Sequence, residues 1–290
     1  MTRHFLTGEE LTGDELARLL ERAAELKADR GASDALAGRS VALIFEKPST
    51  RTRISFEVGV NELGGDAVVL REGEMQLSRG ESVRDTALVL SRYVAAIGVR
   101  TGPHEPLVEL AEHATVPVVN MLTADHHPCQ VLADLLTLKE RFQRLDGLKL
   151  AYVGDGNNVA HSLMIIAPSV GVEVSVATPA ELAPKPVGSA RVVTDPAEAV
   201  EGANAVYTDV WVSMGDEDAV GRRELLEPYR LDEALLGRAA DDAIALHCLP
   251  AHVGEEITAE VLYGPRSAVW DQAENRLHAQ KALLELLVAR

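Results

Sequence analysis

The sequence predicts an α/β protein with two doubly wound parallel-sheet domains and an active site in the cleft between them. Short apolar, β-branched segments alternate with longer segments of helical periodicity, which is the pattern of parallel βαβ units. At 290 residues the chain is long enough for two domains that each bury a core. Its unusual polar clusters follow predicted strands, where open α/β sheets bind their ligands.

The first half of the chain contains four predicted strands. They are expected at Val41–Phe45, Ala67–Leu70, Ala95–Val99 and Pro117–Asn120. The helix after the first strand is expected to bury Ile54, Phe56 and Val58 and to stop at Gly64 and Gly65, because glycine commonly ends helices.

Two later helices of this half have recognisable start signals. Ser82 and Asp85 form the S-x-x-D pattern that precedes a helix. Pro128 occupies the expected first position of another helix, where proline is favoured. Apolar residues then recur at helical spacing, at Val131, Leu132, Leu135 and Leu138.

A polar stretch at 139–147 is interpreted as the junction between two domains, at residues 1–143 and 144–271. The second half is expected to contain a helix from about Asn157 and a closing amphipathic helix at Gln272–Val288. Residues 272–290 are expected to pack back on the first domain. Four further strands are predicted, at Lys149–Val153, Glu173–Ala177, Ala205–Thr208 and Ala243–Leu246. The segment Pro179–Ser189 has three prolines and is too short for a normal crossover helix.

Composition excludes several classes of protein. The formal net charge is −17, with 45 acidic against 28 basic residues, so neither nucleic acid nor an anionic membrane is an expected partner. Two distant cysteines, Cys129 and Cys248, predict no disulfide framework. With no signal peptide and no apolar run long enough for a membrane span, the expected location is the cytoplasm.

The segment Pro48–Arg53 is the sharpest candidate for a binding site. It follows a predicted strand and places three hydroxyls and two arginines at the start of a helix. Helix N–H groups, the positive end of the helix dipole and planar guanidinium groups all favour an anion. A capped helix with solvated arginines is the alternative, but capping accounts for one hydroxyl only. The segment is not a Walker loop.

Other polar clusters also follow predicted strands, and each has a less specific alternative. The turn Gly154–Asn158 suggests a dinucleotide site, but it lacks the third glycine, and Ala177-Thr178 stands where an acidic ribose ligand is expected. No Cys-His-Asn/Asp arrangement suggests that Cys248 is a nucleophile. No set of residues has metal-ligand spacing, so neither a metal nor a cofactor is expected.

Four of these clusters resemble, in order, the motifs of the aspartate/ornithine carbamoyltransferase family. They are Ser49–Arg53, His127–Gln130, Asp209–Gly215 and His247–Pro250. The cysteines in His-Pro-Cys-Gln and His-Cys-Leu-Pro are typical of the ornithine branch. Because the similarity spans essentially the whole chain, the family's fold and chemistry are expected throughout.

The resemblance implies transfer of the carbamoyl group of carbamoyl phosphate to the δ-amine of L-ornithine, giving L-citrulline and phosphate. The expected context is arginine metabolism, and biosynthesis in particular. The first domain would bind carbamoyl phosphate and the second ornithine. Transfer would be direct, without a covalent enzyme intermediate, and would depend on positioning and on polarisation of the carbonyl group.

The resemblance also assigns residues. The catalytic residues would be Arg100, His127, Cys248 and Arg276. Carbamoyl phosphate would be bound by Ser49, Thr50, Arg51, Thr52, Gln76, Arg100, His127, Gln130, Cys248, Leu249 and Arg276. Ornithine would be bound by Asn158, Asp209, Ser213 and Met214. Gln76 would come from a neighbouring subunit of a homotrimer, or of a multiple of trimers.

Several alternatives stand beside these assignments. Arg100 could be an exposed arginine, Arg276 a solvated residue of the last helix, and Asn158 a capping residue. Trp211 is more simply a core residue. Val253 stands where relatives commonly carry Arg, and the loss of that Arg would loosen a mobile loop. The nearest rival function uses another amine acceptor, such as putrescine or N-acetylornithine. A silent binding relative and a dehydrogenase are more distant rivals.

Overall fold

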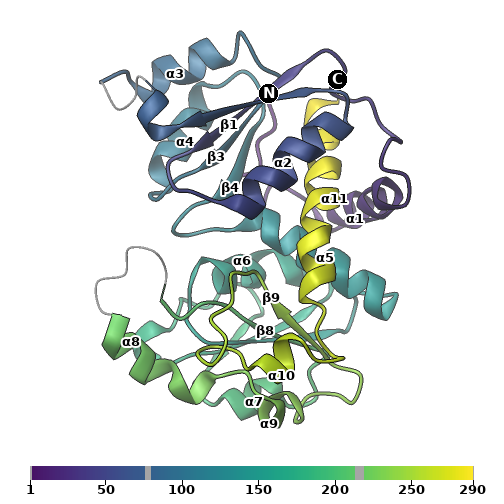
Figure 1. Cartoon of the computed structure of the whole chain (residues 1–290), viewed down its shortest axis with the longest axis vertical. Helices are drawn as coiled ribbons and strands as arrows, with labels where there is room; N and C mark the ends of the chain where they lie inside the picture. The colour runs from purple at the N-terminus through teal and green to yellow at the C-terminus, as the bar shows by residue number, and fades with distance from the viewer. Residues whose placement is uncertain (1, 76–79, 213–218, 290) are drawn as a thin grey trace. The chain divides into compact units, whose positions relative to one another are not determined.

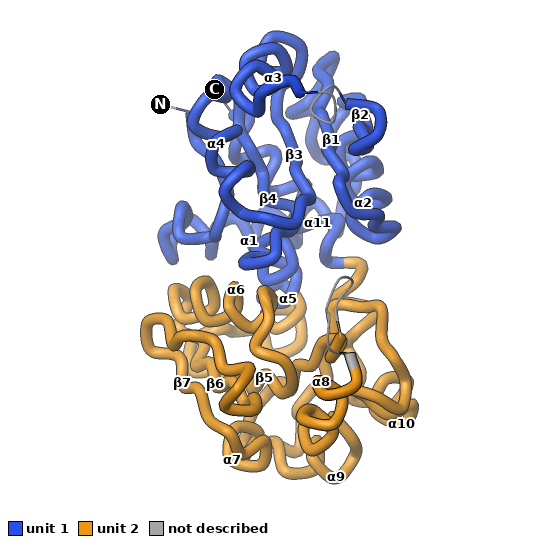
Figure 2. The backbone as a smooth tube through the Cα atoms, turned by 90° about the vertical axis from the view of Figure 1, so that its left-hand side faces the viewer, with its two compact units in different colours: residues 1–136, 275–290 blue, residues 137–274 orange. Residues whose placement is uncertain are grey.

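The computed structural model describes residues 2–75, 80–212 and 219–289. The chain divides into two compact units, one made of Met1–Leu136 with Asn275–Arg290 and the other of Thr137–Glu274 (Figure 2). The first division falls inside helix α5 (Pro128–Phe142) and the second inside helix α11 (Val269–Val288). The polypeptide therefore passes from one unit to the other within helices.

Unit 1 contains a parallel sheet with strand order β2-β1-β3-β4. The strands are β1 (Ser40–Phe45), β2 (Asp66–Arg71), β3 (Ala96–Arg100) and β4 (Val118–Leu122). All four strands predicted for this half are confirmed. Phe45, at the end of β1, lies opposite Arg71 of β2 and Arg100 of β3. The register therefore brings the carboxyl ends of these three strands to one edge of the sheet.

Helices cover both faces of this sheet (Figure 1). On one face lie α3 (Val83–Leu90) and α4 (Glu105–His113); on the other lie α1 (Gly13–Ala28), α2 (Thr50–Glu62) and the unit 1 part of α11. The Ser82 start signal is confirmed, since its side chain accepts from the Asp85 N–H. Helix α1 was not predicted, although Thr12 and Glu15 form a capping box at its start.

One face of α2 differs from the prediction. Phe56 is fully buried, but Ile54 is 55% exposed and Val58 only half-buried. The buried residues of α2 are Thr52, Phe56, Gly59 and Val60, which share one side of a 3.6-residue helix. Ile54 is two positions from Phe56, so it points to nearly the opposite side. The assignment of Ile54 to the core was therefore wrong.

Unit 2 contains a parallel sheet with strand order β7-β6-β5-β8-β9. The strands are β5 (Lys149–Val153), β6 (Glu173–Ala177), β7 (Arg191–Val193), β8 (Ala205–Thr208) and β9 (Ile244–His247). The four strands predicted for this half are confirmed, and β7 at the edge of the sheet was not predicted. Between β6 and β7 the only helical piece among these fully described residues is the 3-10 turn Ala180–Leu182, as the Pro-rich segment indicated.

Helix α6 (Asn158–Ile166) covers one face of this sheet, and α7 (Pro196–Val200), α9 (Glu233–Leu236) and α10 (Ala259–Leu262) cover the other (Figure 1). Trp211 belongs to the core on the latter face, which confirms its interpretation as a core residue. Helix α8 (Ala219–Leu226) follows the residues that are not described. Further 3-10 turns occur at Glu72–Glu74, Ala167–Val170 and Glu227–Tyr229.

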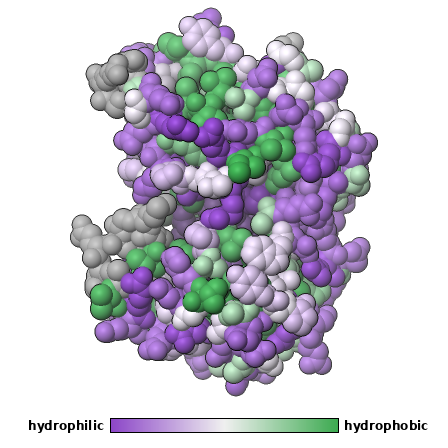
Figure 3. Space-filling view, in the orientation of Figure 1, coloured by the Kyte–Doolittle hydropathy of each residue, from purple (hydrophilic) through white to green (hydrophobic). Residues whose placement is uncertain are grey.

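Helix α5 is longer than the polar stretch at 139–147 suggested, since it continues to Phe142. Lys139 and Arg141 lie in its last turn, where basic side chains interact favourably with the negative end of the helix dipole. Hydrophilic residues cover most of the face of each unit seen in Figure 3. Over the described residues, no helix combines the length and the apolar character that crossing a membrane requires.

Replacement of Gly98 by Ala should destabilise the sheet of unit 1. A Cβ atom at Gly98 would lie 2.9 Å from the sulfur of Met121 and 3.1 Å from Cδ2 of Leu43, inside a packed core. Such overpacking costs about 1–3 kcal/mol. The control is Gly73→Ala, where a Cβ atom meets nothing within 4 Å. Urea unfolding measures both variants, and equal stabilities would contradict this account of the core.

Candidate functional site

The start of α2 combines several groups that attract an anion. Ser49 caps the helix, and its hydroxyl oxygen accepts from the N–H of Thr52 at 3.3 Å. Thr50 and Arg51 follow in the first turn and are exposed, and this turn contains no acidic residue. A positive side chain at the positive end of a helix dipole is unfavourable by itself, so this arrangement is stabilised when an anion binds.

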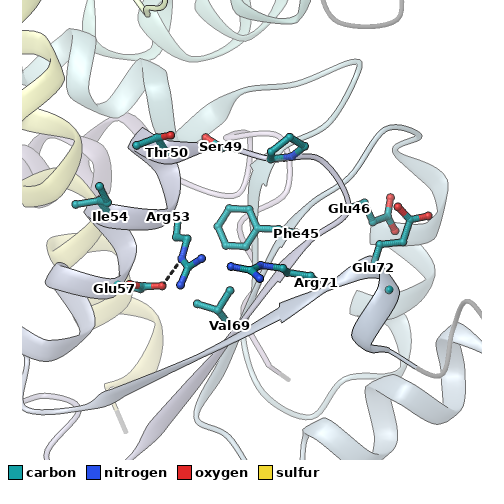
Figure 4. A pocket seen from close by; sticks show the side chains of 12 residues that line it. Phe45, Glu46, Ser49, Thr50, Arg53, Ile54, Glu57, Val69, Arg71 and Glu72 are labelled. Atoms are coloured by element: carbon teal, nitrogen blue, oxygen red, sulfur yellow. Dashed lines mark hydrogen bonds and ion pairs between the residues drawn. The ribbon is translucent and has the colours of Figure 1, made fainter.

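A cavity of about 740 Å³ opens beside this helix start, within unit 1. Ser49 and Thr50 line it, together with Phe45 at the end of β1. The side chains of Arg53 and Arg71 extend into the cavity near the ring of Phe45, and Arg53 forms an ion pair of 2.6 Å with Glu57 (Figure 4). Two of the four predicted phosphate residues, Ser49 and Thr50, therefore border an open space, whereas Arg51 and Thr52 do not line it.

Two uncharged groups hold Arg276 against the start of α2. Its side chain donates to the hydroxyl oxygen of Thr52 at 3.2 Å and to the amide oxygen of Gln130 at 2.7 Å. Gln130 in turn donates to Asp134 at 2.8 Å. Arg276 is only 5% exposed, so the alternative of a solvated arginine on the last helix is wrong. Thr52, Gln130 and Arg276 are thus brought together from three helices.

His127 precedes α5 directly and lies in a positively charged environment. Burial, reinforced by the charges of Arg276 and Arg100, lowers the pKa of His127 well below its ordinary value of 6.5. The ring is therefore neutral at pH 7, and it can donate one N–H to a ligand without carrying a charge. Arg100 is the last residue of β3 and is half-buried, so it is not the exposed surface arginine of the alternative.

In unit 2, Asp209 follows β8 and is held by two donors. The thiol of Cys248, which follows β9, donates to one carboxylate oxygen at 2.7 Å. The side-chain amide of Asn157 donates to the other oxygen at 2.7 Å. Asn157 also caps α6, because its own amide oxygen accepts from the N–H groups of Val159 and Ala160. Asp209 is 4% exposed, so both of its oxygens are fixed in a largely buried position.

The electrostatic field at this edge of unit 2 is negative. Burial raises the pKa of Tyr152 well above its ordinary value of 10, and the charges of Asp209 and Asp155 raise it further. Asp155 is paired with Arg222, with nitrogen–oxygen distances of 2.8 and 2.9 Å. Asp209 is bound instead to a thiol and an amide, which carry no positive charge. The edge therefore retains an affinity for a cation.

The structure brings several of the described site residues together within one unit or the other, such as Thr52, Gln130 and Arg276 in unit 1. Cys248 and Leu249, which the resemblance assigned to carbamoyl phosphate, lie in unit 2 beside Asp209. Asn158, the first residue of α6, lies next to the capping Asn157. Gln76, Ser213 and Met214 lie outside the described residues.

Three supporting residues, Asn157, Asp134 and Glu256, were not predicted. Only Asn157 left a signal in the sequence, because an asparagine in a turn before a helix is a common cap. Asp134 and Glu256 act through partners that their position in the sequence does not reveal. Asp134 accepts from Gln130, and Glu256 is bonded to His247.

Asp209, His247 and Cys248 carry potential metal-ligand atoms within 4.8 Å of one another. Both ring nitrogens of His247 are already engaged, one with the N–H of Leu249 at 2.8 Å and the other with Glu256 at 3.1 Å. The imidazole lone pair that a metal requires is thus occupied by a hydrogen bond. The cluster fits a hydrogen-bonded network better than a metal centre.

Comparisons with known proteins agree over the whole chain. Residues 3–140 match the family described as aspartate/ornithine carbamoyltransferase, carbamoyl-P binding domain. Residues 146–287 match the family described as aspartate/ornithine carbamoyltransferase, Asp/Orn binding domain. The ornithine carbamoyltransferase of Acidothermus cellulolyticus is 55% identical, with 99% of this chain and 97% of the relative covered. That of Methanoculleus marisnigri is 51% identical, with coverage of 100% and 98%.

Two solved structures are similar throughout. The ornithine carbamoyltransferase from Pyrococcus furiosus superposes with a TM-score of 0.92 at 46% identity, covering 97% of this chain and 96% of its own. The one from Thermus thermophilus gives a TM-score of 0.93 at 45% identity, with full coverage of both chains (100% and 100%).

Replacement of His127 by Gln should change how stability depends on pH. In the folded chain His127 stays neutral, whereas in the unfolded chain it takes up a proton below about pH 6.5. The unfolded state then binds more protons, so His127 lowers the free energy of unfolding by up to about 1.4 kcal/mol for each pH unit below about 6.5. Urea unfolding at several pH values should show a shallower acid loss for His127→Gln, and identical slopes would contradict a neutral His127.

Proposed function

Because the chain belongs to the aspartate/ornithine carbamoyltransferase family, we propose that it transfers the carbamoyl group of carbamoyl phosphate to the δ-amine of L-ornithine. The products are L-citrulline and phosphate. One observation carries this proposal: unit 1 has a cationic group of donors around His127, and unit 2 has an acidic group around Asp209. The first suits an anionic phosphate and the second suits an ammonium group.

Carbamoyl phosphate binds to unit 1 in this proposal, through its phosphate and its carbonyl group. Ser49, Thr50, Arg51 and Thr52 hold the phosphate. The open cavity beside Ser49 and Thr50 and the lack of an acidic residue in the first turn of α2 support this role. The hydroxyl oxygen of Thr52 accepts from Arg276, so its hydrogen is the atom that can donate to a phosphate oxygen.

The carbamoyl group lies beside Arg100, His127, Gln130 and Arg276. A neutral His127 donates one N–H to the carbonyl oxygen, and the positive charge of Arg100 lies near the same oxygen. Donors placed in advance stabilise the negative charge that grows on this oxygen during the reaction. The amide oxygen of Gln130 accepts from the carbamoyl NH₂, and its fixed position supports this, because Arg276 and Asp134 bind the two ends of the amide.

Ornithine binds to unit 2. Asp209 pairs with its α-ammonium group, Asn158 contacts its carboxylate, and Ser213 and Met214 contact the α-amino end. The thiol of Cys248 and the carbonyl oxygen of Leu249 lie beside the reacting amine, and the hydrogen bond from Cys248 to Asp209 supports their common role.

The reaction is a direct transfer. The δ-amine has a lysine-like pKa of about 10.4, so it must lose a proton before its nitrogen attacks the carbamoyl carbon. A C–N bond forms and the C–O bond to phosphate breaks. The nitrogen, which lost its first proton to the solvent before the attack, then gives up a second proton, and the departing phosphate carries this second proton away. The required groups polarise and position the substrates, and no enzyme nucleophile takes part.

The working form is proposed to be a homotrimer or a multiple of trimers, in which Gln76 of a neighbouring subunit completes the carbamoyl phosphate site. The domain boundaries proposed for these roles remain those expected from the sequence, and no metal or cofactor is assigned. Arginine biosynthesis in the cytoplasm is the proposed setting, which Cys129 and Cys248 support because neither forms a disulfide.

The direct test offers carbamoyl phosphate with four acceptors in parallel, which are ornithine, putrescine, N-acetylornithine and aspartate. The proposal predicts a carbamoylated product with ornithine only, measured as citrulline. Product from another acceptor would keep the mechanism and overturn the assignment of the ornithine site. No product from any acceptor would favour a binding protein without activity.

The division of work between the units predicts reciprocal effects of two variants. Arg51→Ala removes a charged contact to the phosphate and should weaken carbamoyl phosphate binding by at least about tenfold. Asp209→Asn keeps the size of the side chain but removes its charge, so it should chiefly raise the ornithine KM. Calorimetry with carbamoyl phosphate and steady-state kinetics measure these effects. If Asp209→Asn weakened the binding of carbamoyl phosphate and left the ornithine KM unchanged, the division of work between the units would be contradicted.

A further inference from the structure

His247 and Glu256 form a buried pair beside the proposed ornithine site. His247 is 1% exposed and Glu256 is fully buried. The N–H of Leu249 donates to Nδ1 of His247 at 2.8 Å, so this nitrogen must present its lone pair. The hydrogen network therefore puts the ring hydrogen on Nε2, which faces a carboxylate oxygen of Glu256 at 3.1 Å. Glu256 thus fixes the orientation and the tautomer of His247.

Glu256 holds both ends of the segment 247–252. The same carboxylate oxygen that faces His247 also accepts from the N–H of His252 at 2.5 Å. Glu256 is itself held, because its carbonyl oxygen accepts from the N–H of Leu231 at 2.8 Å. The buried carboxylate of Glu256 therefore links the start of the loop to its far end, and the backbone of Glu256 is tied to Leu231.

The loop needs such support because Leu249 adopts a left-handed backbone conformation, with φ of 60°. A leucine in this region is strained, and the surroundings must offset the strain. The N–H of Leu249 is the group that bonds to His247. Cys248 lies between the two residues of that bond, and its thiol reaches Asp209 at 2.7 Å. The place of the thiol thus depends on the Glu256–His247–Leu249 chain of hydrogen bonds.

We propose that Glu256 and His247 are positioning residues that hold Leu249 in its left-handed conformation and so place the Cys248 thiol on Asp209. This rests on the proposed function, in which Cys248 and Leu249 lie beside the reacting amine. His247 does not act as a proton acceptor for Cys248, because both of its ring nitrogens are engaged with Leu249 and Glu256. The pair acts through geometry and not through proton transfer.

Two matched pairs of variants separate the hydrogen bond between Glu256 and His247 from the one between His247 and Leu249. Glu256→Gln keeps an acceptor toward His247, whereas Glu256→Met keeps the size and removes it. In His247→Asn the amide oxygen takes the place of Nδ1 and preserves the bond to Leu249. In His247→Gln the amide nitrogen takes the place of Nε2 and loses that bond. The matched control is Glu255→Met. Glu255 carries the neighbouring carboxylate, which pairs with Arg223 at 3.0 Å and takes no part in the hydrogen bonds from Glu256 to Leu249.

The alkylation of Cys248 by iodoacetamide reports on the position of the thiol without requiring activity. Cys129, the other cysteine, does not interfere, because burial raises the pKa of its thiol to about 12. Cys248→Ser confirms the assignment of the signal. The second readout is the KM for ornithine compared with the KM for carbamoyl phosphate.

Glu256→Met and His247→Gln should be alkylated about fivefold faster, since the thiol is released from Asp209, and their ornithine KM should rise about tenfold. Their carbamoyl phosphate KM should stay within about twofold of the wild-type value. Glu256→Gln and Glu255→Met should resemble the wild type in both readouts, whereas His247→Asn, which keeps the bond to Leu249 but loses the contact with Glu256, should lie between the wild type and His247→Gln.

Wild-type alkylation and ornithine KM in folded Glu256→Met and His247→Gln would overturn the proposal. Equal effects in His247→Asn and His247→Gln would also overturn it, because only the latter loses the bond to Leu249. Should Glu256→Met not fold, the His247 pair decides. If the wild-type chain forms no citrulline, the proposed function fails separately, and the alkylation rates still test the positioning role.

Discussion

The parallel direction of every strand in both sheets is the constraint on which the candidate site depends. Each strand of a parallel sheet ends at the same edge, so residues far apart in the sequence meet there without a common local motif. In unit 1 this edge receives Ser49 after β1 and Arg100 at the end of β3. In unit 2 it receives Asp209 after β8 and Cys248 after β9. Apolar strands buried between helices fix these positions, so the polar residues need not stabilise the fold.

The two edges differ in the sign of their charge, although the chain as a whole carries −17. His127 and Tyr152 are both buried, and burial alone would keep each of them neutral. Their neighbours act in opposite senses, since Arg276 and Arg100 disfavour a proton on His127, while Asp209 and Asp155 favour one on Tyr152. A strongly acidic protein can thus keep an anion site, provided that cations are concentrated near it and partly shielded from water.

The sequence predicted what depends on neighbouring residues and missed what depends on distant ones. The strands and the Ser82 cap carry local signals, namely apolar β-branched runs and a side chain that reaches three residues ahead. The burial of Ile54 was predicted wrongly, because hydropathy does not reveal which side of α2 faces the core. The contact of Arg276 with Gln130 joins residues 146 positions apart, so no spacing could indicate it. Family resemblance selected Arg276, and the three-dimensional structure supplied its partners.

The way in which Arg276 and Asp209 are held has a consequence for affinity. Two of the groups that bind Arg276, Thr52 and Gln130, are uncharged, and so are the Cys248 thiol and the Asn157 amide that bind Asp209. An arginine partner for Asp209 would orient its side chain equally well but would cancel its charge. Uncharged partners fix the geometry in advance and leave the charge for the ligand. Part of the ordering cost of binding is thereby met during folding, when the surrounding apolar core forms.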